Sequence, residues 1–334
     1  MEQESIVIPE ITAPNTVVIL ATGGTIAGSG EAGKETGYTS GTLSVDSIVA
    51  DIPSLAELAN IKSVQICNVN SDDITAKTWL HIARFINACA ENPNVLGFVI
   101  THGTDTMEET AYFLNLTVRT DKPVVLTGSM RPATALSADG AMNLYQSVVV
   151  AAAPQSRGRG VLVVFSDRIF SARSVEKKST YSVMAISANE MGCVGIVRNR
   201  EINYYEMPGK RHTNESEFSI DGLDDLPRVS IVYFAVDQDP ALITFAAERS
   251  EGIVIAGAGA GEFSEDFMRA INALDIPVVI SSRIDDGIIT QDSVLCPNTV
   301  AANNLSPQKA AILLRLALTR GTDSAELIRI FDEY

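Results

Sequence analysis

The sequence lacks any long apolar run: none of its apolar stretches reaches the roughly 18 residues of a membrane-spanning helix. Its first residues, MEQESIVIPEITAPN, are polar and acidic, without the basic and apolar regions of a signal peptide. As written, the chain is therefore expected in the cytoplasm. If the sequence begins after a removed signal, the same chain would be periplasmic.

Basic residues are also scarce, with 25 Lys and Arg against 41 Asp and Glu, and the net charge is −16. So negative a chain repels phosphate backbones and anionic lipid headgroups. Nucleic acid and membrane surfaces are therefore not expected as partners.

The usual metal ligands are few and scattered. The chain has only three histidines, His81, His102 and His212, and none of its four cysteines forms a CxxC pair. No ligand spacing typical of a metal site appears. We expect no metal, and we expect the cysteines to act mostly as small buried apolar side chains.

What the sequence does contain is enough apolar material for a core: 46% of its residues are hydrophobic and 20% are charged. Short, continuous apolar runs such as VLGFVI (95–100) alternate with helical patterns such as TAKTWLHIARFINACAE (75–91). Continuous runs indicate strands buried on both faces, and helices between strands imply a mostly parallel sheet.

The alternation is interrupted between residues 171 and 219, where the chain is polar and poor in aliphatic runs. We therefore predict an α/β protein in two parts. Residues 1–210 form a larger N-terminal domain with a mostly parallel sheet between helices, 211–225 a linker, and 226–334 a smaller C-terminal α/β domain.

In open α/β sheets, ligands bind beyond the carboxyl ends of the strands. The candidate strand ends are Thr22–Thr25, Thr101–Asp105, Asp167 and Gly257–Gly261. In the first, glycines allow close backbone approach to a ligand, and a threonine hydroxyl can attack a carbonyl carbon if a neighbour takes its proton. A glycine turn with a threonine helix cap is the competing interpretation, and this motif alone does not exclude it.

The second motif, THGTD, sets Thr104 beside Asp105 at a strand end. A carboxylate there can hold an ammonium group, and a hydroxyl can position water or a carbonyl. Thr106 and Glu109 fit a capping box that begins the next helix, which leaves the two preceding polar residues for chemistry. His102 is expected to be packed and hydrogen-bonded rather than catalytic.

Dinucleotide binding is the weaker alternative. GSGEAG (28–33) matches G-x-G-x-x-G, but it does not directly follow a strand, and no hydrophobic helix continues from it. GAGAG (257–261) does follow a strand, but Glu262 stands where the last glycine is needed and would repel a pyrophosphate.

Several segments together resemble the bacterial type II L-asparaginases and glutaminase-asparaginases, and the resemblance runs from about Asn15 to Tyr334. They are ILATGGTIAGSG (19–30), VITHGTDTMEETAYFLNLTV (99–118), KPVVLTGSMRP (122–132), SADGAMNLY (137–145) and LSPQKAAILLRLAL (305–318). The resemblance implies hydrolysis of the side-chain amide of asparagine, with or without glutamine, by an amidohydrolase that needs no cofactor.

The resemblance also implies roles for individual residues. The nucleophile falls on Thr25, beside Gly24, and the loop tyrosine that relays its proton falls on Tyr38. The family's second active-site hydroxyl falls on Thr104, and the lysine that accompanies it falls on Lys177. The remaining positions are expected to bind substrate: Asp105 the ammonium group, and Ser71 with Asp72 the backbone end of the amino acid.

Three positions depart from the family pattern. Asp72 stands where the family often has Gln or Glu, one methylene longer. Glu262 stands where many members have an Asn that reaches a neighbouring subunit's site. Val294 replaces a Glu that would accompany the loop tyrosine. The cysteine that would pair with Cys89 is missing near Thr120, so Cys89 is expected to be a free thiol.

Two hypotheses follow. In the favoured one, the chain is an active asparaginase that works through a threonine nucleophile as a homotetramer, a dimer of dimers, on a small amino-acid amide. The departures motivate the other, a paralogue that binds an amino acid or amide with little or no turnover.

Overall fold

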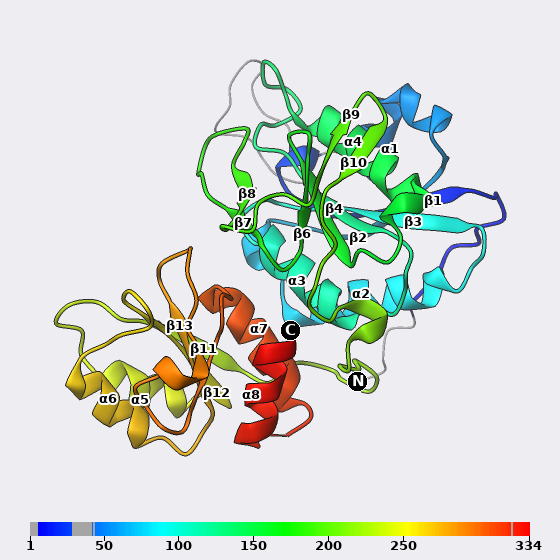
Figure 1. The fold of residues 1–334 in the computed structure, drawn as a ribbon. Helices are drawn as coiled ribbons and strands as arrows, with labels where there is room; N and C mark the ends of the chain where they lie inside the picture. Colours follow the sequence, from blue (N-terminus) through cyan, green and yellow to red (C-terminus); the bar gives the residue numbers. More distant parts are fainter. Residues whose placement is uncertain (1–5, 29–41, 43, 322) are drawn as a thin grey trace. The chain divides into compact units, whose positions relative to one another are not determined.

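The structure, a computed structural model, describes residues 6–28, 42, 44–321 and 323–334. The chain divides into two compact units, Met1–Asp221 and Gly222–Tyr334. Each unit has its own sheet and its own helices (Figure 1).

The N-terminal unit is built on an eight-stranded sheet. In spatial order its strands are β10 (Glu201–Tyr204), β9 (Gly195–Arg198), β6 (Arg168–Ser171), β5 (Val161–Phe165), β4 (Val124–Thr127), β3 (Val95–Thr101), β1 (Thr16–Gly23) and β2 (Asn60–Val69). The strands from β5 to β2 run parallel, and β6, β9 and β10 extend the sheet antiparallel. The strand order reverses between β1 and β3, and a crevice at such a switch point is where ligands bind in open α/β sheets.

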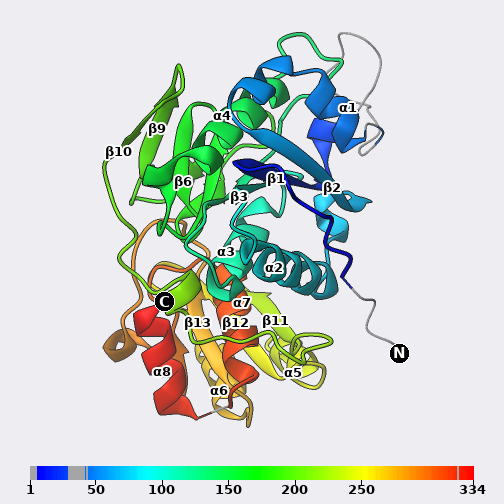
Figure 2. The ribbon, with the colours of Figure 1, turned by 90° about the vertical axis from the view of Figure 1, so that its right-hand side faces the viewer.

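Helices cover both faces of this sheet (Figure 2). On one face, α1 (Val45–Ala50) and α4 (Gly140–Ala152) share an apolar core with alternate residues of β1. On the other lie α2 (Ala76–Ala90) and α3 (Met107–Thr117), joined by stacking of Trp79 on Phe113 with ring centroids 5.2 Å apart. Burial on both faces explains why every residue of β1 is buried.

A separate hairpin, β7 (Val175–Lys177) with β8 (Ile186–Ala188), follows β6 in the polar segment of the sequence. It carries Lys177 at the end of its first strand. The sequence indicated only extended pieces and loops in this segment.

The C-terminal unit has a four-stranded parallel sheet in chain order: β11 (Val229–Tyr233), β12 (Gly252–Gly257), β13 (Val278–Ser282) and β14 (Thr299–Ala301). One face packs on α5 (Ala241–Ala247) and α6 (Glu265–Asn272). Against the other lies α7 (Pro307–Leu318), with α8 (Ser324–Glu333) beside it. The predicted fold, a larger N-terminal α/β part with a mostly parallel sheet and a smaller C-terminal α/β part, is confirmed.

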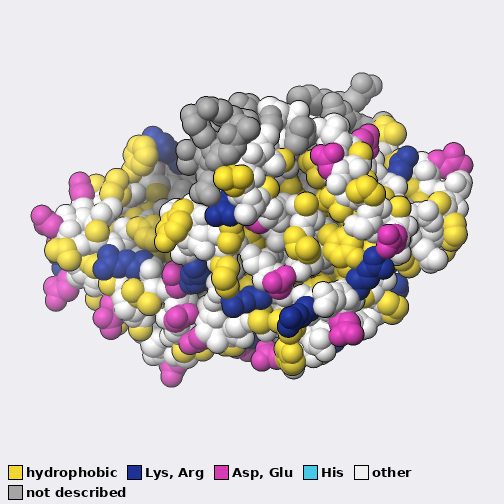
Figure 3. Space-filling view, turned by 90° about the horizontal axis from the view of Figure 1, so that it is seen from above, with side chains coloured by type: hydrophobic (Ala, Val, Ile, Leu, Met, Phe, Trp, Pro, Cys, Tyr) yellow, Lys and Arg dark blue, Asp and Glu magenta, His cyan; other side chains and the backbone are white. Residues whose placement is uncertain are grey.

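The described residues include no helix with both the length and the apolar character that crossing a bilayer requires. On the face drawn in Figure 3, acidic side chains are scattered among basic and apolar ones. All four cysteines are free. Cys89 and Cys296 are buried as expected, whereas Cys67 and Cys193 are only partly buried.

Directly behind the end of β3, a buried polar chain joins α2, α3 and the β3 loop. Trp79 Nε1 donates to Thr110 Oγ1 at 2.8 Å, and Thr110 Oγ1 lies 2.9 Å from His102 Nε2. His102 Nδ1 lies 2.7 Å from the carbonyl of Gly103. A carbonyl only accepts, so Nδ1 carries the proton and Nε2 accepts from Thr110. The expectation that His102 is packed and hydrogen-bonded is confirmed.

Burial lowers the pKa of His102 from 6.5 to about 4, against the opposing effect of its bond to Gly103. The unfolded chain therefore takes up a proton between these pH values while the folded chain does not. We predict that this imidazole contributes about 3 kcal/mol of stability above pH 6.5, lost as the pH falls towards 4. Urea unfolding of the wild type and of His102→Gln across this range measures the effect. The wild type should lose more stability on acidification than the variant, and equal losses would contradict the prediction.

Candidate active site

The loops after β1 and β3 touch backbone to backbone at the switch point. Gly24 has φ +80°, and a Cβ built on it would lie 2.5 Å from Gly103 N. Only glycine fits there, because any side chain would separate the loops. Thr25, buried at 9% exposed, opens the short 3-10 turn Thr25–Ala27 directly after this contact.

The loop after β2 packs against the loop after β3. Ser71 begins the 3-10 turn Ser71–Asp73 and is buried, and a Cβ on Gly103 would lie 2.7 Å from Ser71 Oγ. Its neighbour Asp72 is exposed. The glycine motif, the serine and the THGTD motif are thus brought together.

The predicted capping box of Thr106 and Glu109 is wrong. Thr106 does occupy the position before α3, but its side chain makes no cap hydrogen bond. Instead Thr106 Oγ1 donates to the carbonyl of Ser71 at 2.7 Å. The hydroxyl is turned towards the carbonyl of the neighbouring loop, and it accepts no hydrogen bond from the backbone N–H groups of the first turn of α3. Thr106 therefore ties the β2 loop to the β3 loop.

The hairpin β7–β8 brings Lys177 to Thr104 and Asp105. Lys177 Nζ donates to Thr104 Oγ1 at 2.9 Å and forms an ion pair with Asp105 Oδ1 at 2.5 Å. The lysine side chain is 16% exposed, whereas that of Asp105 is 68% exposed. The Lys177 ammonium group is thus largely enclosed between the β7–β8 hairpin and the loop after β3. The Asp105 carboxylate keeps an exposed side that can bind a further cation.

Glu108 binds the backbone of this lysine. Its carboxylate is buried in the first turn of α3, and Oε2 accepts a hydrogen bond from the backbone N of Lys177 at 2.7 Å. The sequence did not reveal this role of Glu108. A buried acid within an apolar helix was the available signal, but its partner lies 69 residues away.

The structure describes three of the four other residues that the sequence singled out. Tyr38 lies outside the described residues. Asp167 sits in the β5–β6 turn, where its Oδ1 accepts from Gln146 Nε2 at 2.5 Å. Glu262 is exposed and closes the turn after β12 by pairing with Ala258. Val294 packs against the apolar core of the C-terminal unit.

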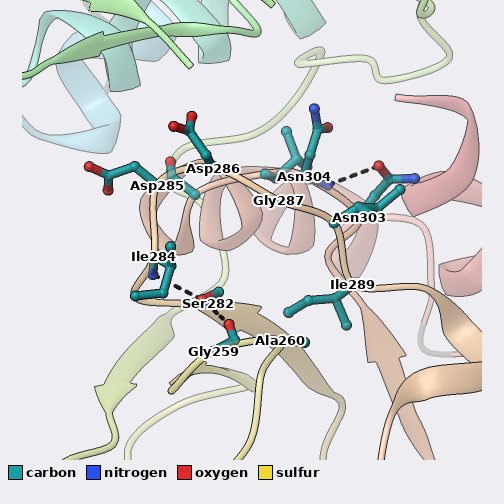
Figure 4. Close-up of a pocket in the computed structure, with 13 residues that line it drawn as sticks. Gly259, Ala260, Ser282, Ile284, Asp285, Asp286, Gly287, Ile289, Asn303 and Asn304 are labelled. Carbon is teal, nitrogen blue, oxygen red and sulfur yellow. Dashed lines mark hydrogen bonds between the residues drawn. The ribbon is translucent and has the colours of Figure 1, made fainter. Parts of the chain in front are cut away.

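The C-terminal unit has a hollow of about 200 Å³ at the carboxyl ends of its strands (Figure 4). Asp285 and Asp286 stand on the loop after β13, across from Asn303 and Asn304, which follow β14. Ser282 Oγ donates to the carbonyl of Gly259 at 2.6 Å and fixes the loops at its base. Among the described residues of the whole chain, no three His, Cys, Asp or Glu gather closely enough to hold a metal.

Two protein-family models match the chain, one after the other along the sequence. The family model "Asparaginase, N-terminal" matches residues 16–210, and "Glutaminase/Asparaginase C-terminal domain" matches residues 228–331. The chain is 42% identical to L-asparaginase 2 of Escherichia coli (strain K12), over 97% of this chain and 94% of that protein. It is 40% identical to the glutaminase-asparaginase of Acinetobacter glutaminasificans, over 96% of this chain and all of that protein.

A solved structure agrees as well. The crystal structure of a probable cytoplasmic L-asparaginase from Campylobacter jejuni matches with a TM-score of 0.92 at 38% identity, over 96% of this chain and 100% of that one. Two family models in sequence order, relatives matched over nearly their full length and a matching solved fold lead to one conclusion: this chain belongs to the asparaginase family.

Proposed function

We propose that this protein hydrolyses the side-chain amide of L-asparagine to the acid and ammonia, with Thr25 as the nucleophile. Relatives named L-asparaginase and glutaminase-asparaginase support the reaction class. The observation that carries the assignment of residues is the hydrogen bond from Lys177 Nζ to Thr104 Oγ1. It places a cationic group on a hydroxyl in the same crevice as the Thr25 turn.

The chemistry proceeds in two halves. Thr25 Oγ attacks the amide carbon, the amide nitrogen takes a proton and leaves as ammonia, and an acyl-enzyme ester remains. Water then attacks the ester and returns the proton to Thr25. Backbone N–H groups of the glycine loop, together with Thr104, stabilise the negative charge that develops on the carbonyl oxygen in both halves.

Lys177 and Thr104 act as the proton-handling pair in this proposal. The 2.9 Å separation of Nζ and Oγ1 allows a proton to pass along the hydrogen bond. Because the ion pair with Asp105 holds Nζ at this place, Lys177 is oriented before substrate arrives. Tyr38 remains the expected relay for the Thr25 proton.

Substrate orientation is assigned to Asp105, Ser71 and Asp72. The exposed side of the Asp105 carboxylate binds the substrate's α-ammonium, and Ser71 binds its α-carboxylate. Asp72, one methylene shorter than the usual family residue, lies exposed beside Ser71 and meets the ammonium from a second direction. Discrimination between asparagine and glutamine then depends on one methylene of pocket depth, about 1–3 kcal/mol.

We predict that Thr25→Ala lowers the rate of ammonia release from L-asparagine by at least about 10⁴-fold, because no other group forms the ester.

Lys177→Met should lower kcat by about 10²–10⁴-fold, the range for loss of a proton-transfer group. A coupled ammonia assay measures both. Undiminished activity of Thr25→Ala would refute the nucleophile assignment. L-aspartate binding without ammonia from any amide would instead favour the paralogue with little turnover.

A second prediction concerns Glu108, which we infer to be a positioning residue for Lys177. Glu108→Leu removes the acceptor of the Lys177 backbone N–H and lets the lysine shift, which should lower kcat by up to about 100-fold with little change in KM. Glu108→Gln keeps an acceptor oxygen and should retain most of the activity. If both variants behave alike, or if only KM changes, Glu108 does not act through Lys177.

We also propose that the protein assembles as a homotetramer. The C-terminal unit exposes apolar side chains that solvent disfavours, on edge strand β11 and on α5: Ile231, Tyr233, Leu242 and Phe245. Glu262 is exposed and available to a second subunit. Light scattering should give the mass of a tetramer, and a fully active monomer would contradict sites shared between subunits.

A further inference from the structure

Two of the segments that resemble the asparaginase family, KPVVLTGSMRP and SADGAMNLY, have no part in the chemistry proposed above, yet the structure joins them. The first contains β4 and the loop after it, residues 128–131, which we call the β4 loop. The second contains the residue before α4 and the first turn of that helix. Strands β3 and β4 are neighbours, and His102 N donates to the carbonyl of Thr127 at 2.8 Å, so the β4 loop lies beside the loop of Thr104.

The β4 loop approaches Thr104 at Gly128. A Cβ built on Gly128 would lie 2.4 Å from the carbonyl oxygen of His102 and 3.5 Å from Thr104 Cγ2. The methyl group of Thr104 thus lies next to Gly128, while its hydroxyl oxygen accepts from Lys177 Nζ at 2.9 Å. Methyl and hydroxyl are branches of one Cβ, so a contact that fixes the methyl also fixes the direction of the hydroxyl.

Two side chains at the start of α4 bind the backbone of the β4 loop. Asn143, which is 2% exposed, donates from Nδ2 to the carbonyl of Gly128 at 3.0 Å. The carboxylate of Asp139 accepts from the backbone N of Met130 at 2.9 Å and of Arg131 at 3.0 Å. An Asp before a helix usually caps that helix, but Asp139 makes no such bond to α4. Both of its oxygens bind the β4 loop instead.

The Asn143 amide has a single orientation. Its Nδ2 also donates to Asp139 Oδ2 at 3.2 Å, and its Oδ1 accepts from the backbone N of Ser166, in the turn after β5, at 3.0 Å. A carbonyl and a carboxylate only accept and a backbone N–H only donates, so a flipped amide would lose all of these bonds. The β4 loop is therefore bound to a fixed group.

We propose that Asn143 and Asp139 are positioning residues for Thr104: they keep the β4 loop against its methyl group and so keep its hydroxyl directed at Lys177. If the loop moves away, Thr104 can rotate about its Cα–Cβ bond and exchange the methyl for the hydroxyl. The rotation breaks the hydrogen bond to Lys177 Nζ. This inference rests on the proposed function, in which Thr104 and Lys177 handle the protons.

The ammonia assay with L-asparagine tests the proposal. Asn143→Leu removes the donor to Gly128 and should lower kcat by about 10–100-fold, the range for a small misplacement of a reacting group. KM should change little, because the substitution acts on Thr104 rather than on Asp105 or Ser71. Asp139→Asn removes one acceptor from the β4 loop and should lower kcat by about threefold to tenfold.

Asn115→Leu is the matched control. Asn115 is also a buried asparagine, and its Oδ1 accepts from the backbone N of Val161 at 2.9 Å, at the start of β5 and away from the carboxyl ends of the strands. Both leucine variants remove the acceptor of a backbone N–H, so both should lower Tm. Only Asn143→Leu should lower kcat, and an equal loss of kcat in both variants would overturn the proposal.

A double-mutant cycle with Thr104→Ser separates positioning from general damage. Serine keeps the hydroxyl but has no methyl group for the β4 loop to contact. The further loss of kcat caused by Asn143→Leu should therefore be at least about threefold smaller in the Thr104→Ser background than in the wild type. Additive losses would contradict an action through the methyl group. If Asn143→Leu does not fold, Asp139→Asn takes its place in the cycle.

A crystal structure of Asn143→Leu, or of Asp139→Asn if the first does not fold, supplies a readout that needs no turnover. We expect Thr104 Oγ1 to have turned away from Lys177 Nζ. An unchanged bond between these atoms in a variant with lowered kcat would overturn the proposal. Failure of the asparaginase assignment appears instead as undiminished activity of Thr25→Ala, so the two failures are distinguishable.

Discussion

The backbone contact between Gly24 and Gly103 is the constraint on which the site depends. Two adjacent parallel strands end there, and their loops lie closer than any side chain would allow. Because the loops touch, Thr25 and Thr104 each follow directly on one side of this contact. The contact lies at the strand reversal between β1 and β3, where open α/β sheets bind their ligands.

Hydrogen bonds from partly or fully buried polar side chains fix the loops after β2 and β3 and the strand β7. His102 holds the carbonyl of Gly103, Thr106 holds the carbonyl of Ser71, and Glu108 holds the backbone of Lys177. A hydrogen bond in such a low-dielectric place is strong, and an unmade one is costly, so these contacts restrict the loops to one arrangement. Between these fixed loops, the Asp105 carboxylate keeps its exposed side.

Much of this arrangement could be predicted from the sequence. The continuous apolar run at 95–100 predicted β3 because a strand buried on both faces needs one, and helical spacing at 75–91 predicted α2. The strand-end rule singled out the loops of Thr25 and Thr104 without any structure. The position of Lys177 came from resemblance alone, because a short hairpin in a polar segment carries no periodic pattern.

Other elements could not be predicted from the sequence, for physical reasons. Strand β2 is only partly buried along its length, so its sequence shows no apolar run, and β14 is three residues long. The capping box failed because a local rule competed with a bond to Ser71 that the sequence cannot reveal. The role of Glu108 could not be predicted for the same reason, because its hydrogen-bond partner, Lys177, lies far along the chain and outside its own helix.

The hydrogen bond between Lys177 and Thr104 joins positions 73 residues apart, and the Thr25 turn precedes both. During synthesis the glycine loop emerges first, the second threonine next and the lysine last. On the proposed function, a nascent chain therefore carries its nucleophile, Thr25, well before the lysine that completes the proton path. On the same proposal, a chain that ends before Lys177 has both threonine loops but lacks the proton path that turnover requires.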